Sequence, residues 1–269
     1  LPNTRPRSVI QFADDTNMTS RNAKDFSTLM DIVKIFENGT GSKLNKNKTE
    51  VLIVGNERKI GDMSEIPNKN RKKIVKLLGM WFGENADEKN FKMIEQKIDK
   101  DLLKWNLPYL SLQGKILILK SVILPKILYI ARIRPLKEEQ IQKLEKKFRE
   151  FIWGKDKIVR MSIKTLQNAM EDGGMDCPNI RTLQQAALVE RIPKCINNPK
   201  LPWTGLLAYR LGISLRHVDD FFKKAKLRQC KQSLTTREIQ TVYYQLRDNV
   251  NKWDTLDFRR LKEMLYKKS

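Results

Sequence analysis

Two adjacent carboxylates near the start of the sequence could bind divalent cations. They belong to the tetrad Phe12-Ala13-Asp14-Asp15, within the segment SVIQFADDTNMT (residues 8–19). Carboxylate oxygens are the ligands that hard cations such as Mg²⁺ prefer. Two such ions at one site can activate an attacking hydroxyl and stabilise a leaving phosphate. An Asp-Asp pair is also ordinary turn chemistry, so the tetrad alone does not separate a metal site from a plain turn.

The segments around the tetrad predict a small α/β unit that would position it. Residues 8–12 are strand-like and residues 13–15 are turn-like. Apolar spacing predicts a helix over residues 26–36, with Asp25 as its N-cap. Further strands are predicted over residues 50–54 and, as a strand pair or one kinked strand, over residues 75–82.

The remainder of the chain, from about residue 84, has the periodicity of helices. Apolar residues recur at helical spacing over residues 91–105 and 141–151. Residues 114–134 predict a long apolar helix that is kinked or broken before Pro125, because proline cannot donate the backbone hydrogen bond. The last helices are predicted over residues 182–196 and 255–267. The fold class is therefore α+β, an α/β segment followed by an all-helical part.

The charge of the chain indicates a polyanionic partner. Lysine and arginine number 53 against 31 aspartates and glutamates, a formal net charge of +22. A compact domain with this excess repels itself, and nucleic acid is the usual compensating partner. A membrane is the rival, but there is no lipidation motif, and the most apolar stretch contains Lys120, Lys126 and Arg132. We therefore expect RNA or DNA as the partner, and no membrane.

The cysteines and the single histidine argue against a zinc site of the usual kind. Cys177, Cys195 and Cys230 have no CxxC spacing, and His217 is the only histidine. Scattered thiols are typical of a reducing compartment, which predicts an intracellular protein, in the nucleus or in a cytoplasmic ribonucleoprotein. No signal peptide is present, and the start at Leu1 suggests a fragment or a processed product.

A series of motifs follows the tetrad in a definite order. The series is LNKNKTE (residues 44–50), LLGMWFG (77–83), LSLQGK (110–115), ILPKILY (123–129), FIWGK (151–155) and DGGM (172–175). This order and spacing resembles the reverse transcriptases of non-LTR (LINE-type) retrotransposons, and the resemblance covers residues 8–200.

The resemblance implies roles for residues of the palm, the domain that carries a polymerase active site. Asp14 would be a direct ligand of Mg²⁺, and Asp15 a second, weaker carboxylate. Phe12 and Ala13 belong to the same hairpin and are candidates for nucleic-acid binding. Lys48 would lie near the phosphates of the incoming nucleotide, as a proton donor to pyrophosphate.

The resemblance also implies contacts to the template-primer. Leu78 and Gly79 match the hairpin that grips the primer end, where a glycine lets the backbone approach the strand. The helices between residues 91 and 151 would form the thumb, which cradles the duplex. The phosphate-contact candidates in the thumb, chosen by charge, are Lys115, Lys120, Lys126 and Arg132. The implied domains are the C-terminal half of the palm (1–85), a helical thumb (86–155) and a helical C-terminal extension (156–269).

One departure from the family bears on activity. The family uses a further metal-binding aspartate on an earlier palm strand, whereas residues 1–7 contain no acidic side chain. We therefore expect the fingers and the first half of the palm to be absent, and this chain to be inactive alone. The chain would bind an upstream polymerase segment, or self-associate through the exposed edge of the half-palm at residues 8–20.

Three hypotheses follow. The chain is a fragment of an RNA-directed DNA polymerase; or it is a non-catalytic, domesticated RNA- or DNA-binding module; or it is a basic structural protein in which the motif series is coincidental. The first two differ in whether an upstream segment supplies the missing aspartate.

Overall fold

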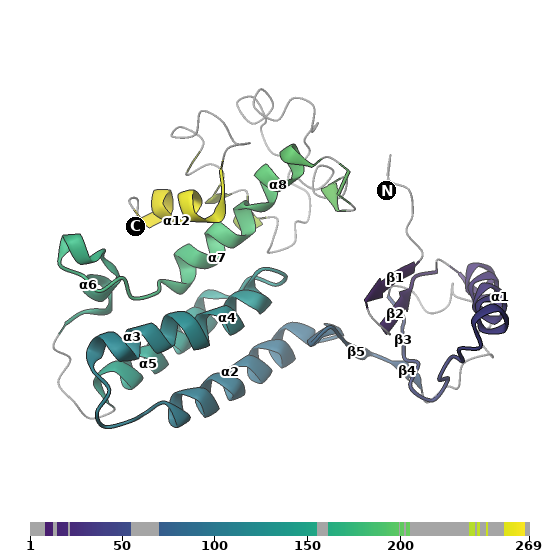
Figure 1. Cartoon of the computed structure of the whole chain (residues 1–269), viewed down its shortest axis with the longest axis horizontal. Helices are drawn as coiled ribbons and strands as arrows, with labels where there is room; N and C mark the ends of the chain where they lie inside the picture. Colours follow the sequence, from purple (N-terminus) through teal and green to yellow (C-terminus); the bar gives the residue numbers. More distant parts are fainter. Residues whose placement is uncertain are drawn as a thin grey trace. The chain divides into compact units, whose positions relative to one another are not determined.

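The computed structural model describes a mostly helical α+β protein. The described residues are 9–12, 15–20, 22–54, 70–154, 161–198, 200–201, 203–204, 237–239, 241–242, 246 and 256–266. The chain divides into two compact units, one of Pro2–Asn90 and one of Phe91–Ser269 together with Leu1. Each unit is described below by itself (Figure 1). Among the described residues, no helix is both long enough and apolar enough to cross a membrane.

In its described residues, the first unit contains three small sheets and one long helix. Strand β1 (Val9–Phe12) pairs antiparallel with β2 (Asp15–Met18), and α1 (Ala23–Thr40) follows. The remaining strands are β3 (Val51–Leu52), which pairs parallel with β4 (Arg71–Lys72), and β5 (Ile74–Leu77), which pairs antiparallel with β6 (Met80–Gly83). The predicted pair over residues 75–82 is thus confirmed as a hairpin.

Helix α1 begins earlier than predicted, and its N-cap is a different residue. The cap is Asn22, whose Oδ1 accepts a hydrogen bond from the backbone N–H of Asp25 at 2.8 Å. The prediction of Asp25 as the cap was therefore wrong, because Asp25 lies in the first turn, where its charge is favourable near the helix N-terminus. The helix ends at Gly41, which adopts the left-handed conformation with φ 71°.

The second unit is built from helices that pack around an apolar core. The helices are α2 (Ala86–Lys104), whose residues up to Asn90 belong to the first unit, α3 (Leu112–Ile118), α4 (Leu124–Ala131), α5 (Glu138–Trp153), α6 (Ile163–Gln167), α7 (Ile180–Val189), α8 (Arg191–Asn197) and α12 (Phe258–Tyr266). Figure 1 shows α2 and α5 running alongside the line that α3 and α4 form one after the other, and α7 packs against α4, α5 and α12. The predicted apolar stripe of α5 is confirmed as core, since Ile141, Leu144, Phe148 and Phe151 are buried.

The long apolar helix predicted around Pro125 exists, and its irregularity lies just before the proline. A π-helical segment, η3 (Leu119–Ile123), joins α3 to α4, and the N–H of Leu124 donates to the carbonyl of Leu119. Pro125 has no N–H to offer the preceding turn, and the Ser121 hydroxyl donates to the carbonyl of Leu117 at 2.7 Å. Both features disturb the regular hydrogen-bond ladder where the π-segment forms.

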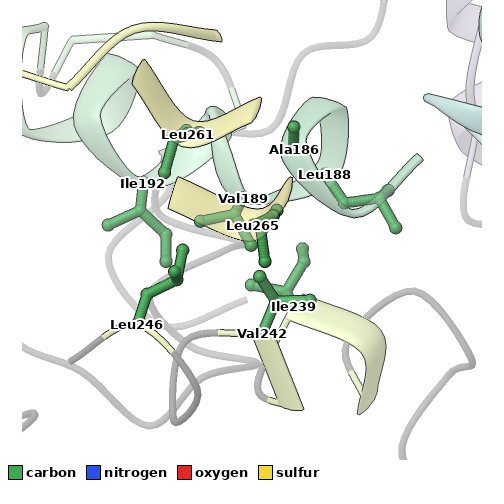
Figure 2. Packing of buried hydrophobic residues seen from close by; sticks show 9 residues of the cluster. All are labelled: Ala186, Leu188, Val189, Ile192, Ile239, Val242, Leu246, Leu261 and Leu265. Atoms are coloured by element: carbon green, nitrogen blue, oxygen red, sulfur yellow. The ribbon is translucent and has the colours of Figure 1, made fainter. Parts of the chain in front are cut away.

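The C-terminal residues complete the core of the second unit. The predicted helix over residues 182–196 is interrupted at Glu190, which separates α7 from α8. The predicted helix over 255–267 is confirmed as α12. Figure 2 shows the resulting cluster of buried apolar side chains: Ala186, Leu188, Val189, Ile192, Ile239, Val242, Leu246, Leu261 and Leu265. Ile239, Val242, Leu246 and the apolar side chains of α12 therefore bury the apolar side of α7 and α8.

Candidate nucleic-acid interface

The β1–β2 hairpin carries the paired aspartates of the sequence analysis. Its register pairs Phe12 with Asp15, so that Ala13 and Asp14 connect the two strands. Both connecting residues lie outside the described part of the chain. Phe12 is 64% exposed, and Asp15 is exposed at the first position of β2. The hairpin therefore presents Phe12 and Asp15 to solvent at its tip.

The donor chemistry of this hairpin suits Mg²⁺, but the described residues do not make up a complete site. Asp15 supplies a hard oxygen ligand. Among the described residues, no three or more His, Cys, Asp or Glu side chains gather closely enough to coordinate a metal ion. No catalytic step through a metal follows from the described residues.

Lys48 lies in a tight turn between α1 and β3. The carbonyl of Asn45 accepts hydrogen bonds from the N–H groups of Lys48 and Thr49, both at 3.0 Å, and Asn45 Oδ1 accepts from Lys48 N at 3.2 Å. Nδ2 of the buried Asn70 donates to the carbonyl of Lys46 at 2.6 Å. These bonds hold the backbone of the turn and leave the Lys48 side chain exposed.

The tip of the β5–β6 hairpin has a strained backbone. Leu78 and Gly79 form a two-residue connection in which both φ angles are positive, 46° and 82°. Positive φ at both positions is the pattern of a type I′ turn, which matches the twist of the flanking strands. A leucine in this region costs about 1–2 kcal/mol, since its Cβ crowds the following carbonyl. The exposed Leu78 side chain is therefore displayed at the tip despite that cost.

A buried asparagine attaches this hairpin to the start of α2. Asn90 Oδ1 accepts from the N–H of Trp81 at 2.8 Å, and Asn90 Nδ2 donates to the carbonyl of Trp81 at 2.9 Å. The Lys89 ammonium lies 3.4 Å from the centroid of the Trp81 ring, and the Lys76 ammonium lies 5.8 Å from it. The amide therefore satisfies the strand edge as a neighbouring strand would, and the two cations pack on the ring.

The four basic residues predicted to contact phosphates all have polar partners inside the protein. The pairs are Lys115 with the carbonyl of Ile152 (3.0 Å), Lys120 with the carboxylate of Asp176, Lys126 with the carboxylate of Asp101, and Arg132 with the carboxylate of Glu190 (3.8 Å). These pairs lie within the second unit, and they join residues on or next to its helices to other helices or to the connections between them. A phosphate would have to compete with the partner that each cation already has.

The inner face of α2 packs into the core, and the acidic residues on its two flanks pair with lysines of other helices. Ile94, Ile98 and Leu102 recur at helical spacing on the inner face and are buried, as the sequence predicted. The acidic residues Glu95, Asp99 and Asp101 lie on the flanks, between the inner and the outward face. Each of these acids pairs with a lysine of α4 or α5.

On one flank of α2, the acids form short ion pairs with two lysines of α5. Glu95 Oε1 lies 2.8 Å from Nζ of Lys143 and 3.2 Å from Nζ of Lys147, and Asp99 Oδ1 lies 2.5 Å from Nζ of Lys147. Burial alone would raise the pKa of Glu95, but the hydrogen bonds from the two lysines outweigh burial and lower it. Burial would lower the pKa of Lys147, and its bonds to Asp99 and Glu95 outweigh that effect and raise it. The flank is therefore a charged but internally balanced contact.

The outward face of α2 is basic and unbalanced. It is made of the exposed residues Lys92, Gln96, Lys97, Lys100, Leu103 and Lys104. In the part of the chain that the structure describes, none of these four lysines has an acidic side chain within 4 Å. From residue 92 to residue 104 the helix rises about 18 Å, long enough to lie along several consecutive phosphates.

The outward face of α2 was not among the sites predicted from the sequence. Its signal was present, because residues 92, 96, 100 and 104 recur every four positions opposite Ile94, Ile98 and Leu102. Charge counting could not identify it, because α2 also contains acids whose lysine partners lie about 25 to 48 residues away in sequence. Only the folded structure shows that the acids of α2 pair with lysines of α4 and α5, and that the outward lysines of α2 have no acidic partner in the described residues.

A search against models of known protein families finds none that matches this chain.

Proposed function

We propose that the chain is the C-terminal palm segment and thumb of a non-LTR retrotransposon reverse transcriptase. We further propose that these 269 residues bind an RNA–DNA template-primer without extending the primer. The observation that carries the binding proposal is the outward face of α2, with Lys92, Lys97, Lys100 and Lys104 exposed and without acidic partners in the described chain. Unpaired lysines along one helix attract phosphates and release counterions when they bind.

The family part of the proposal rests on the motif series and draws support from the element order. In the proposed palm, the tetrad hairpin β1–β2 is followed by α1, then by the turn that contains Lys48, and then by the β5–β6 hairpin. Leu78 and Gly79, at the tip of that second hairpin, would contact the primer end. The helices from α2 to α5 would be the thumb.

The absence of primer extension follows from the number of carboxylates. Asp14 and Asp15 would bind Mg²⁺ in the proposed palm, and bound Mg²⁺ would supply charge stabilisation for phosphoryl transfer. No acidic residue precedes Asp14 in this chain, so the third carboxylate that the resemblance implies has to come from elsewhere. We place the function inside the cell, in the nucleus or in a cytoplasmic ribonucleoprotein, where RNA and DNA are available.

The test is the salt dependence of binding to a labelled RNA–DNA duplex. The variant replaces Lys92, Lys97, Lys100 and Lys104 with glutamine, and the matched control replaces four other exposed lysines, Lys24, Lys43, Lys72 and Lys164. Both variants lose the same charge. We expect the α2 variant to reduce the slope of log K against log [salt] by about 3. We expect the control to retain most of the affinity.

Equal losses in the two variants would contradict the proposed interface, because they would show that affinity follows net charge and not the outward face of α2. Unchanged binding by the α2 variant would contradict it as well. Circular dichroism of both variants checks that the helices remain, which is expected because all eight lysines are exposed.

A further inference from the structure

The C-terminal end of α2 adds exposed apolar surface to its basic face. Leu103 is 79% exposed and Tyr109 is 81% exposed, values unusual for large apolar side chains. Leu103 lies on the outward face of α2 between Lys100 and Lys104. Tyr109 follows five residues after the helix ends, in the connection to α3.

The backbone around Tyr109 is ordered by short-range hydrogen bonds. The N–H of Asn106 donates to the carbonyl of Leu103 at 3.3 Å, and the N–H of Leu107 donates to the carbonyl of Trp105 at 2.9 Å. The N–H of Leu110 then donates to the carbonyl of Leu107 at 3.2 Å. The connection is therefore a series of turns that starts from the last residues of α2, and Tyr109 projects from it into solvent.

An exposed ring in the turns that follow lysines without acidic partners in the described residues has the composition of a stacking site for a nucleobase. Base–aromatic stacking uses the face of the base, and the lysines bind the phosphates on either side. The interior of a duplex exposes no base faces, so such a site selects an unpaired nucleotide. Phe36, another exposed ring, lacks this setting, because the nearby Lys34 is paired with Asp31 at 3.6 Å.

We propose that Tyr109 and Leu103 bind an unpaired base of an RNA or DNA strand whose phosphates contact Lys100 and Lys104. This inference rests on the proposed nucleic-acid binding by the outward face of α2, and it adds a selectivity. The chain distinguishes a template-primer with a single-stranded tail from a blunt duplex.

The variants are Tyr109→Ala, Tyr109→Trp and Leu103→Ser, with Phe36→Ala as a matched control at an exposed ring in the first unit. The probes are a blunt RNA–DNA duplex, the same duplex with a single-stranded RNA tail, and the same duplex with a DNA tail. Thermal unfolding of each variant checks that the fold is unchanged.

We expect Tyr109→Ala to weaken binding of at least one tailed probe about tenfold and to leave blunt-duplex binding unchanged. The salt slope should stay the same, because no charge is removed. Tyr109→Trp should restore tail binding, Leu103→Ser should cause a smaller loss, and Phe36→Ala should have no effect. The comparison of the two tails tells which strand supplies the base.

Equal effects of Tyr109→Ala on blunt and tailed probes would overturn the inference, and so would no effect on any probe. The proposed function fails separately, if the glutamine variant of the α2 lysines binds the blunt duplex as well as the wild type. Vesicles that contain anionic phospholipid provide a rival arm. Loss of vesicle binding in Tyr109→Ala, with tail binding unchanged, would assign this surface to a membrane and overturn the inference.

Discussion

Two buried side-chain amides each form hydrogen bonds to the N–H and the carbonyl of one backbone residue outside their own helix. Asn90 bonds to both the N–H and the carbonyl of Trp81. Gln184, on α7, does the same for Leu136 in the connection between α4 and α5, accepting at 2.7 Å and donating at 3.3 Å. An unpaired buried peptide group is costly, so each amide stabilises an irregular junction.

Asn90→Ala should loosen the β5–β6 hairpin. The substitution leaves the N–H and carbonyl of Trp81 without their partner, at a cost of about 1–3 kcal/mol. Hydrogen exchange at the Trp81 amide should become faster, and the free energy of unfolding should fall. Gln96→Ala, at an exposed position of the same helix, is the control. Unchanged protection of the Trp81 amide would refute this role for Asn90.

Leu78→Asn should stabilise the same hairpin. Asparagine tolerates the left-handed conformation better than leucine does, so we expect the free energy of unfolding to rise by about 1 kcal/mol. Leu78→Val is the contrasting variant, because a β-branched side chain suits φ 46° least and should destabilise. Thermal unfolding of the three proteins measures the order, and a valine variant as stable as the asparagine variant would show that the turn is not strained.

Among the elements, α2 carries two kinds of charged residue: acids that form ion pairs with other helices, and outward lysines that a ligand can reach. Its acidic flanks are joined to α4 and α5, whereas its outward lysines have no acidic partner in the described residues. Helix pairs of this kind are held by partly buried ion pairs, whose value depends on the protonation of the acids.

Glu95→Gln should reduce stability at neutral pH and not at low pH. The folded-state pKa of Glu95 is lowered, so its contribution is present above the unfolded pKa, about 4.3, and is lost as the pH falls through the folded value. We expect wild type and variant to differ by about 1–2 kcal/mol at pH 7 and to converge at acidic pH, below the lowered folded-state pKa of Glu95. Urea unfolding at both pH values measures this, with Glu171→Gln, at an exposed position, as the control. A difference that persists at low pH would contradict the assignment.

The spacing of apolar residues in the sequence predicted the helices and hairpins better than it predicted the side-chain contacts between them. The stripes of α2 and α5 and the β5–β6 hairpin follow from apolar spacing that one segment carries by itself. Pro125 likewise predicted the irregularity that is observed as η3, because the N–H that proline lacks can be read from the sequence alone. Asp25 was the wrong cap because Asn22 lies three residues before it, and both residue types can cap.

The contacts of the candidate site required the fold. Lys120 and Lys126 carry the same charge as Lys100 and Lys104, and nothing nearby in sequence distinguishes them. Their partners, Asp176 and Asp101, lie 56 and 25 residues away. Asp14 and Ala13 lie outside the described residues, so their predicted roles at the tetrad stay predictions.

For the whole molecule, the exposed β1–β2 hairpin bears on association. Val9, Ile10 and Phe12 are all exposed on a sheet that, among the described residues, has two strands and therefore two unpaired edges. A two-stranded sheet is marginally stable alone. We predict concentration-dependent self-association, and we predict that Ile10→Lys reduces it, because an edge charge opposes strand pairing. Size-exclusion chromatography with light scattering measures both. A wild-type chain that stays monomeric at every concentration would contradict the prediction.

We propose above all that this chain binds a template-primer and does not extend it. The most direct test is binding of a labelled RNA–DNA primer-template as a function of salt, with and without Mg²⁺, with deoxynucleotides added in one arm. We predict binding with a slope of log K against log [salt] of about −3 or steeper, and no extended primer. Absence of binding at low salt would contradict it. Mg²⁺-dependent extension that disappears in Asp14→Ala would also contradict it, because it would show that these 269 residues complete the catalytic site.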